Sequence, residues 1–290
     1  WGLQMLIHER KRLEKCYLSF LPENIHVRFV KQILGVNKSA VNSAVLAEAG
    51  RLPLSLFSIK ASIRFWYHII NSSNSSLVKM IYMDGLSFNT ILIQKIERLF
   101  NVTGFSHVWE NQNTFSIKRL EKALVNKLKE RYLSYWKESF EINSSEYNRK
   151  LRTYSKFKHD YKLENYLLLD IDRKEIITYA KIRISDSKLM IEQGRHKQLS
   201  IDERICPLCK TDVEDELHFV TKCRMLDKTR GELYKKIEDI LPEFVNLEDD
   251  EKFKILMSPS DIDICKVCVV EINKMYEIRT QIINQEDNLV

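Results

Sequence analysis

The chain has 290 residues, a net charge of +6 and 44% hydrophobic residues. This length is enough for one large or two smaller domains with a core, and the composition is that of a soluble globular protein, not a disordered one. The longest apolar runs fall well short of the roughly 18 residues that a membrane span needs, and no signal peptide is visible. Because only 7 Gly and 5 Pro are present, helices are favoured over a turn-rich β architecture.

Charge and cysteine usage give two further expectations. Residues 238–263 carry nine acids against two lysines, a net −7, so the remainder of the chain carries +13. An excess of this size suits a nucleic-acid partner, although solvated lysines on a helical protein can give the same value. The six cysteines fit a reducing compartment better than a disulfide framework, so we expect an intracellular protein. Because the chain begins with Trp1, we expect a fragment or a processed product.

The first 110 residues show apolar side chains at helical spacing. This spacing predicts helices over 3–20, from Pro22 to Gly35, in a short Ala-rich stretch ending at Gly50, and over 54–70, 77–83 and 88–101. Between the last two, Asp84 lacks the second carboxylate that a two-metal polymerase site requires, and we expect a loop there.

Two basic segments follow. Residues 116–141 predict a long amphipathic helix with lysines and arginines mostly off its apolar stripe. In 147–162, basic residues alternate with aromatic ones, which suggests phosphate contacts and base stacking. The alternative is an amphipathic element whose aromatics face the core and whose lysines face water. The candidate nucleic-acid contacts are Arg149, Lys150, Arg152, Tyr154, Lys156, Phe157 and Lys158, with Arg195 and Lys197 from a basic turn at Gly194.

The C-terminal part of the chain begins with a helix capped by Asp172. A charged helix is expected to run from Cys223 to about 240, followed by an acidic linker and a terminal helix over about 260–284. Cys265 and Cys268 form a Cys-x2-Cys pair inside an apolar helical run with no second ligand pair. We therefore expect these two thiols to pack in a helix interface and not to bind metal.

The strongest motif is Cys-x2-Cys-x8-His-x4-Cys, formed by Cys206, Cys209, His218 and Cys223. Two thiolates two residues apart can grip one ion from a tight turn, while His218 lies at the start of a predicted helix and Cys223 just past its end. Three sulfurs and one imidazole make a closed tetrahedral site, which indicates structural Zn²⁺ and leaves no open position for a substrate.

These observations predict a mainly α protein: a multi-helix array with a small Cys-Cys-His-Cys zinc module near the C-terminus. We expect three regions: helices over 1–110, a basic helical region over 111–200, and the zinc module with the C-terminal helices over 201–290.

The chain also carries, in order, the blocks LGVNKS, NSAVLAEAGRLPL, YLLLD (166–170) and AKIRISDSKLMIEQGRH (180–196), and then the cysteine–histidine box. This order resembles the carboxy-terminal region of LINE-type retrotransposon reverse transcriptases, the elements without long terminal repeats, over about residues 24–284. In that family the region follows the polymerase thumb and contains a zinc box, on which Cys206, Cys209, His218 and Cys223 of this chain fall.

The resemblance implies a segment that holds template RNA or target DNA during target-primed reverse transcription, beside the polymerase portion of the same polyprotein and in the nucleus. The family's polymerase carboxylates have no counterpart here, and no endonuclease is present, so we expect no catalysis by this chain alone. The alternative function is a zinc-stabilised protein-interaction scaffold without nucleic-acid contact. The salt dependence of RNA binding distinguishes the two functions.

Overall fold

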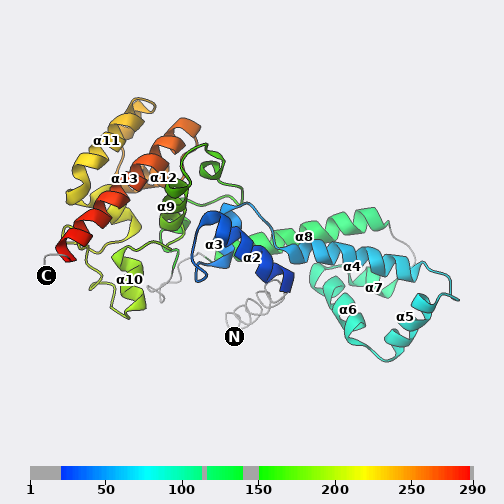
Figure 1. Ribbon diagram of the computed structural model, residues 1–290. Helices are drawn as coiled ribbons and strands as arrows, with labels where there is room; N and C mark the ends of the chain where they lie inside the picture. The colour runs from blue at the N-terminus through cyan, green and yellow to red at the C-terminus, as the bar shows by residue number, and fades with distance from the viewer. Residues whose placement is uncertain (1–20, 113–115, 140–149, 288–290) are drawn as a thin grey trace. The chain divides into compact units, whose positions relative to one another are not determined.

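A computed structural model describes residues 21–112, 116–139 and 150–287, and these residues are mainly helical (Figure 1). In the described part of the chain, strand-like pairing is limited to isolated bridges between Ala49 and Leu163 and between Ile205 and Val213. The predicted helix over 3–20, which includes Cys16, lies outside the described residues. None of the described helices is long and apolar enough to cross a membrane.

The chain divides into two compact units that differ from the three expected regions. Unit 1 comprises residues 1–24 and 52–136, and unit 2 comprises residues 25–51 and 137–290. Unit 1 is therefore largely an insertion into the sequence of unit 2. The division falls within the first described helix, α2 (Leu21–Leu34).

Unit 1 is built from α4 (Leu54–Ile70), α5 (Leu77–Ser87), α6 (Ile91–Thr103), α7 (Ser106–Glu110) and most of α8 (Ile117–Glu138). Its core is centred on Trp66, whose ring lies 4.9 Å from Phe100 and whose indole N–H donates to Tyr82 at 3.0 Å. The apolar stripe of α8, including Leu124 and Leu128, closes this core. The prediction of a loop at Asp84 is wrong, because α5 continues through Asp84 and Gly85. A Cβ on Gly85 would lie 3.2 Å from Thr90 Oγ1, so a small residue at this position permits the close turn into α6.

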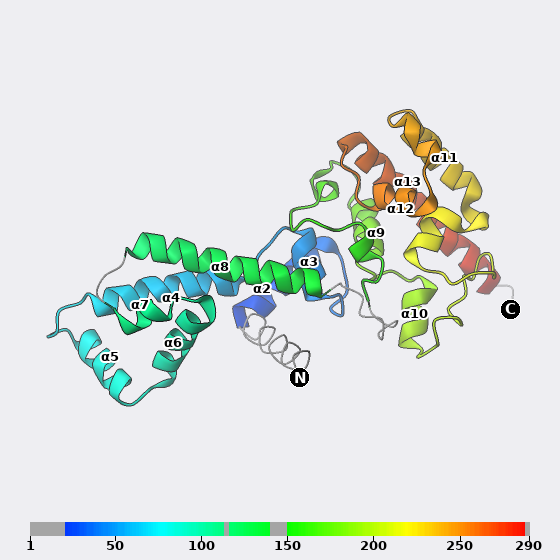
Figure 2. The ribbon, with the colours of Figure 1, turned by 180° about the vertical axis from the view of Figure 1, so that it is seen from behind.

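Unit 2 contains the short helix α3 (Asn42–Glu48) together with α9 (Arg173–Arg183), α10 (Met190–His196), α11 (Asp227–Glu238), α12 (Asp249–Met257) and α13 (Ile262–Asp287). The long helix α13 packs against α9, α11 and α12, as both views show (Figures 1 and 2). The Asp172 cap is confirmed, since its carboxylate accepts from the Lys174 N–H at 2.8 Å.

Two parts of unit 2 differ from the sequence prediction. The acidic linker contains a helix, α12, whose first turn carries Asp249, Asp250 and Glu251; acids at this position stabilise a helix by interacting with its dipole. The basic turn at Gly194 is instead the last turn of α10. A Cβ on Gly194 would lie 2.5 Å from Arg204 Cγ, so the glycine lets α10 pack closely over the buried Arg204.

A polar cluster joins the two sequence segments of unit 2. The fully buried Arg183 donates from Nε and Nη2 to Glu48 at 2.8 and 3.0 Å and lies 2.8 Å from a carboxylate oxygen of Glu164. Tyr154 and Tyr166 donate their hydroxyls to the same Glu48 carboxylate at 2.9 and 2.8 Å. Because Glu48 belongs to α3 and its partners lie more than 100 residues later, this cluster holds the segment 25–51 onto the rest of unit 2.

Candidate metal centre

Cys206 and Cys209 lie on a short loop that hydrogen bonds fold back on itself. The Cys206 N–H donates to Asp212 O at 2.7 Å, the Lys210 N–H donates to Cys206 O at 2.9 Å, and the Ile205–Val213 bridge closes the base. Lys210 adopts φ +57°, a left-handed conformation that glycine adopts more easily. The loop turns both thiols toward the same side.

His218 and Cys223 are positioned by a single π turn, His218–Lys222. The Cys223 N–H donates to His218 O at 2.9 Å, an i to i+5 hydrogen bond. In an α-helix, residues five apart point in directions about 140° apart, so two ligands at this spacing would diverge. The wider π turn brings Cys223 back beneath His218, at the end of the turn as predicted.

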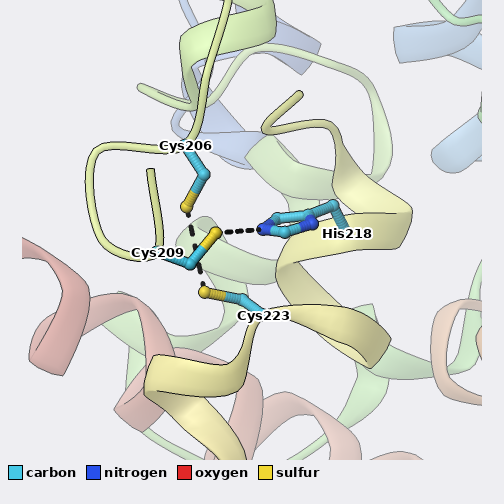
Figure 3. A group of neighbouring side chains, drawn as sticks. All are labelled: Cys206, Cys209, His218 and Cys223. Atoms are coloured by element: carbon cyan, nitrogen blue, oxygen red, sulfur yellow. Dashed lines mark hydrogen bonds between the residues drawn. The ribbon is translucent and has the colours of Figure 1, made fainter. Parts of the chain in front are cut away.

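The four side chains converge on one point, as Figure 3 shows. All four are buried, and their ligand atoms lie within 4.8 Å of one another. Cys206 Sγ lies 3.8 Å from Cys223 Sγ, and Cys209 Sγ lies 3.5 Å from His218 Nε2. The predicted grouping is confirmed: the arrangement could hold a metal ion.

The ligands perturb one another's protonation. The hydrogen bond with Cys223 and burial raise the pKa of Cys206 to about 12, while the same hydrogen bond lowers the pKa of Cys223. Burial opposes the thiolate of Cys209, but hydrogen bonds, chiefly from Thr211, leave its pKa below the ordinary value. Burial also opposes the imidazolium of His218, yet Cys206 and Cys209 outweigh it and raise the pKa of His218. A bound cation would let all three sulfurs ionise together.

A shell of polar groups surrounds the four ligands. The Thr211 hydroxyl donates to Cys209 Sγ at 3.2 Å, and Arg230 donates to the carbonyl of Cys223. Cys206 Sγ lies 3.9 Å from Oε1 of the fully buried Glu214. Arg279 of α13 donates to both oxygens of that carboxylate, at 2.5 and 2.7 Å. The sequence motif did not identify Glu214 or Arg279 as neighbours of the candidate ligands. Arg279 lies 56 positions after Cys223, far outside the motif.

The aromatic residues proposed for base stacking lie in the core of unit 2. Tyr154 is fully buried and bonded to Glu48, and Phe157 is 4% exposed and packs edge-to-face on Phe253 with ring centroids 5.9 Å apart. Neither ring has a face open to a base, which corrects the stacking prediction. The alternative, in which aromatics of 147–162 face the core, describes these two residues.

Most of the predicted phosphate-binding cations already have anionic neighbours. Lys158 is buried against Glu164, and Arg152 lies 3.0 Å from Glu216 and 3.6 Å from Glu192. The other pairs are Lys150 with Asp186 at 3.9 Å, Lys156 with Asp250 at 2.8 Å, and Arg195 with Glu192 at 3.0 Å. Lys197 is exposed after the end of α10, and Arg149 lies outside the described residues. Binding phosphate with the paired residues would require breaking ion pairs, so this segment is a poor polyanion surface.

A basic surface is found instead in unit 1. Residues 52–136 contain eleven Lys and Arg against five Asp and Glu, a net +6, whereas the sequence of unit 2 sums to −1. On α8, the side chains of Lys118, Lys122 and Lys129 are exposed and lie four and eleven residues apart, on the same side of the helix. Arg119 is exposed beside them. We call Lys118, Arg119, Lys122 and Lys129 the α8 basic face.

Cys265 and Cys268 lie on α13 and are not part of the group formed by the four candidate metal ligands. Both are buried, and burial raises the pKa of Cys265 to about 11 and that of Cys268 well above its ordinary value. Within the described residues, the group with ligand geometry consists of Cys206, Cys209, His218 and Cys223.

Comparisons with known proteins add no relative. No protein-family model, curated protein or solved structure matches the chain.

Proposed function

We propose that this protein binds one structural Zn²⁺ at Cys206, Cys209, His218 and Cys223 and holds nucleic acid on the α8 basic face. The proposed setting is the C-terminal segment of a LINE-type reverse transcriptase, where template RNA or target DNA would be the ligand and the polymerase portion the neighbour. The observation that carries the proposal is the charge separation: unit 1 holds the positive charge, and unit 2 is nearly neutral.

Two of the distances between the candidate ligand atoms favour zinc. With Zn–S bonds of about 2.3 Å and Zn–N bonds of about 2.0 Å, a tetrahedral site separates two sulfurs by about 3.8 Å and a sulfur from a nitrogen by about 3.5 Å. Cys206 and Cys223 are 3.8 Å apart, and Cys209 and His218 are 3.5 Å apart. A donor set of three thiolates and one imidazole is suited to Zn²⁺ and unsuited to Mg²⁺ or Ca²⁺. With four protein ligands, the ion would be structural.

The α8 basic face is suited to a phosphate backbone. Lys118 and Lys129 are eleven residues apart, so the face extends about 16 Å along a straight helix. No anionic partner accompanies Lys118, Arg119, Lys122 or Lys129 in the described residues, in contrast to the paired cations of 150–158. When unpaired cations bind phosphates, the counterions condensed on the nucleic acid are released, and this release drives association. The order of sequence blocks that resembles the LINE family supports the same assignment.

Salt-dependent binding tests the proposal. If the four cations of the α8 basic face each neutralise one phosphate, the log–log salt slope for single-stranded RNA is roughly −3. The triple variant Lys118→Ala, Lys122→Ala, Lys129→Ala should make that slope shallower by about 2 and weaken binding to every sequence. Titrations of the full chain with single-stranded RNA and with duplex DNA would also show which is preferred.

A matched control removes the same charge from unit 2. Lys228, Lys235 and Lys266 are exposed there, and their triple replacement by Ala should leave the slope unchanged. Equal losses in both triple variants would mean that net charge, and not the α8 basic face, governs binding. Parental binding by the α8 variant at every salt concentration would reject the face.

A second candidate function is protein docking. The outward side of α5 exposes Leu77, Met80 and Ile81, which are 69%, 53% and 61% exposed. Apolar side chains on both sides of a helix are typical of a helix that is covered on both sides. A chain that binds no nucleic acid at low salt would favour this scaffold function.

A further inference from the structure

We infer that Arg279 is a positioning residue for the metal centre: it neutralises Glu214, whose carboxylate contacts the ligand Cys206. The inference rests on the zinc site proposed above and adds a residue outside the ligand motif. Arg279 lies on the C-terminal helix α13, 56 positions after the last ligand.

The first step is the contact between Glu214 and the ligand. Glu214 is fully buried, and its Oε1 lies 3.9 Å from Cys206 Sγ. The position of this carboxylate is fixed, because the Met190 N–H donates to Oε2 at 2.6 Å and the Glu214 N–H donates to Arg204 O at 2.9 Å. A metal-bound Cys206 is a thiolate, so binding an ion places two negative groups side by side in a water-poor site.

The second step is the compensation of that charge. Arg279 Nε and Nη2 donate to the two oxygens of Glu214 at 2.5 and 2.7 Å, a bidentate pair with side chains only 5% and 1% exposed. Arg279 Nη2 also donates to Lys188 O at 3.0 Å, and the guanidinium lies 6.0 Å from the centre of the Tyr276 ring. The guanidinium therefore has a fixed orientation toward the carboxylate.

The third step is the charge balance of the whole centre. Zn²⁺ with three thiolates and a neutral imidazole carries −1, and Glu214 would bring this to −2 in a buried site. Arg279 returns the total to −1, and without it the repulsion between Glu214 and the thiolate of Cys206 is unscreened. Removal of such outer partners typically lowers metal affinity by about 10–100-fold.

The test is a zinc competition titration of the full chain against a chromophoric chelator. Arg279→Met should weaken zinc binding by roughly 10–100-fold. The double variant Arg279→Met, Glu214→Gln removes the uncompensated charge along with its partner and should regain most of the affinity. Arg279→Lys keeps the charge and should remain within a few-fold of the parent. Lys174→Met is the control, because it breaks an exposed ion pair with Glu277, which lies on α13 like Arg279, and Lys174 touches no candidate ligand.

The outcomes separate charge compensation from packing. If Arg279→Met binds zinc like the parent, or if the double variant binds as weakly as Arg279→Met alone, the inference is overturned. Should Arg279→Met fail to fold, the double variant and Arg279→Lys decide, since both are expected to fold and to bind zinc. A parent protein without zinc affinity would overturn the proposed zinc site itself, a result distinct from failure of the Arg279 variants alone.

Discussion

Replacing Arg183 by Met should destabilise unit 2 strongly, because it leaves the buried carboxylate of Glu48 without the cation that contacts it and removes one of the two cations beside Glu164, which also pairs with Lys158. Arg183 is fully buried between Glu48 and Glu164, and its guanidinium carbon lies 4.8 Å from the centre of the Phe157 ring. Breaking a buried ion pair by removing one partner costs about 3–5 kcal/mol. A domain of this kind is stable by only about 5–15 kcal/mol, so the variant loses a large part of its stability.

Urea denaturation can locate this loss in unit 2. With an m-value of about 2 kcal/mol/M, a cost of 4 kcal/mol lowers the midpoint by about 2 M. The sequence of unit 2 contains no tryptophan, so tryptophan fluorescence follows unit 1, whereas far-UV circular dichroism follows both units. We expect the circular dichroism transition of unit 2 to move to lower urea and the fluorescence transition to change little.

Arg64→Met is a matched control, since Arg64 also makes a bidentate contact with a glutamate, at 2.6 and 3.1 Å from Glu121. Its side chain is 62% exposed, and an exposed pair is screened by water, so little change is expected. If Arg183→Met shifts the midpoint of unit 2 no more than Arg64→Met shifts that of unit 1, the reasoning about the buried cluster is refuted.

Three further predictions concern the metal centre and its surroundings. Cys209→Ser should lower the zinc content and expose residues 200–235 to protease, since zinc binding in small sites contributes on the order of 10–16 kcal/mol; full zinc occupancy by atomic absorption would contradict the ligand assignment. Cys265→Ala with Cys268→Ala should leave zinc stoichiometry unchanged, and loss of an equivalent would show that α13 takes part in the site. Lys210→Gly should raise the stability of unit 2 by about 1 kcal/mol in urea denaturation, because φ +57° is strained for lysine; a lower midpoint would show that the side chain matters more than the backbone.

The candidate metal ligands could be predicted from the sequence because their geometry is local. Cys206 and Cys209 sit on one loop, and His218 and Cys223 on one turn, so spacing alone groups them. The π turn that aligns His218 with Cys223 could not be predicted, since an i to i+5 hydrogen bond has no characteristic pattern of residues in the sequence. Gly35 and Gly50, by contrast, could be predicted as helix ends from the sequence, and both adopt a positive φ, +64° and +59°.

The role of residues 147–162 could not be predicted from the local sequence, because it depends on contacts with residues that are distant along the chain. Tyr154 and Phe157 have the same identity whether they stack on a base or fill a core. Their burial follows from Glu48 and Arg183, residues distant in sequence that need hydroxyl and aromatic neighbours. One signal was present: Glu48 is the lone acid in the apolar run SAVLAEAG, and a buried carboxylate requires a cation elsewhere.

The buried cluster also predicts how the stability of unit 2 depends on pH. Burial opposes the charged form of Glu48, but Arg183, Lys158 and the Tyr166 hydroxyl outweigh it, so the pKa of Glu48 is below its ordinary value of 4.5. A carboxyl group whose pKa is lower in the folded state stabilises the protein fully above pH 4.5, and this contribution is lost as pH falls toward the folded-state pKa.

Glu48→Gln isolates this contribution. The variant lacks the titrating group, so the free-energy difference between parent and variant should be constant above about pH 5 and should shrink below 4.5. The slope for one group is at most about 1.4 kcal/mol per pH unit. Release of the proposed zinc ion at low pH would affect both proteins alike and cancel in the difference. Urea denaturation at half-unit steps from pH 6 to 3 measures it. A difference that stays constant down to pH 3 would mean that Glu48 has the same pKa in the folded and unfolded states, and that the lowered pKa ascribed to Arg183 is wrong.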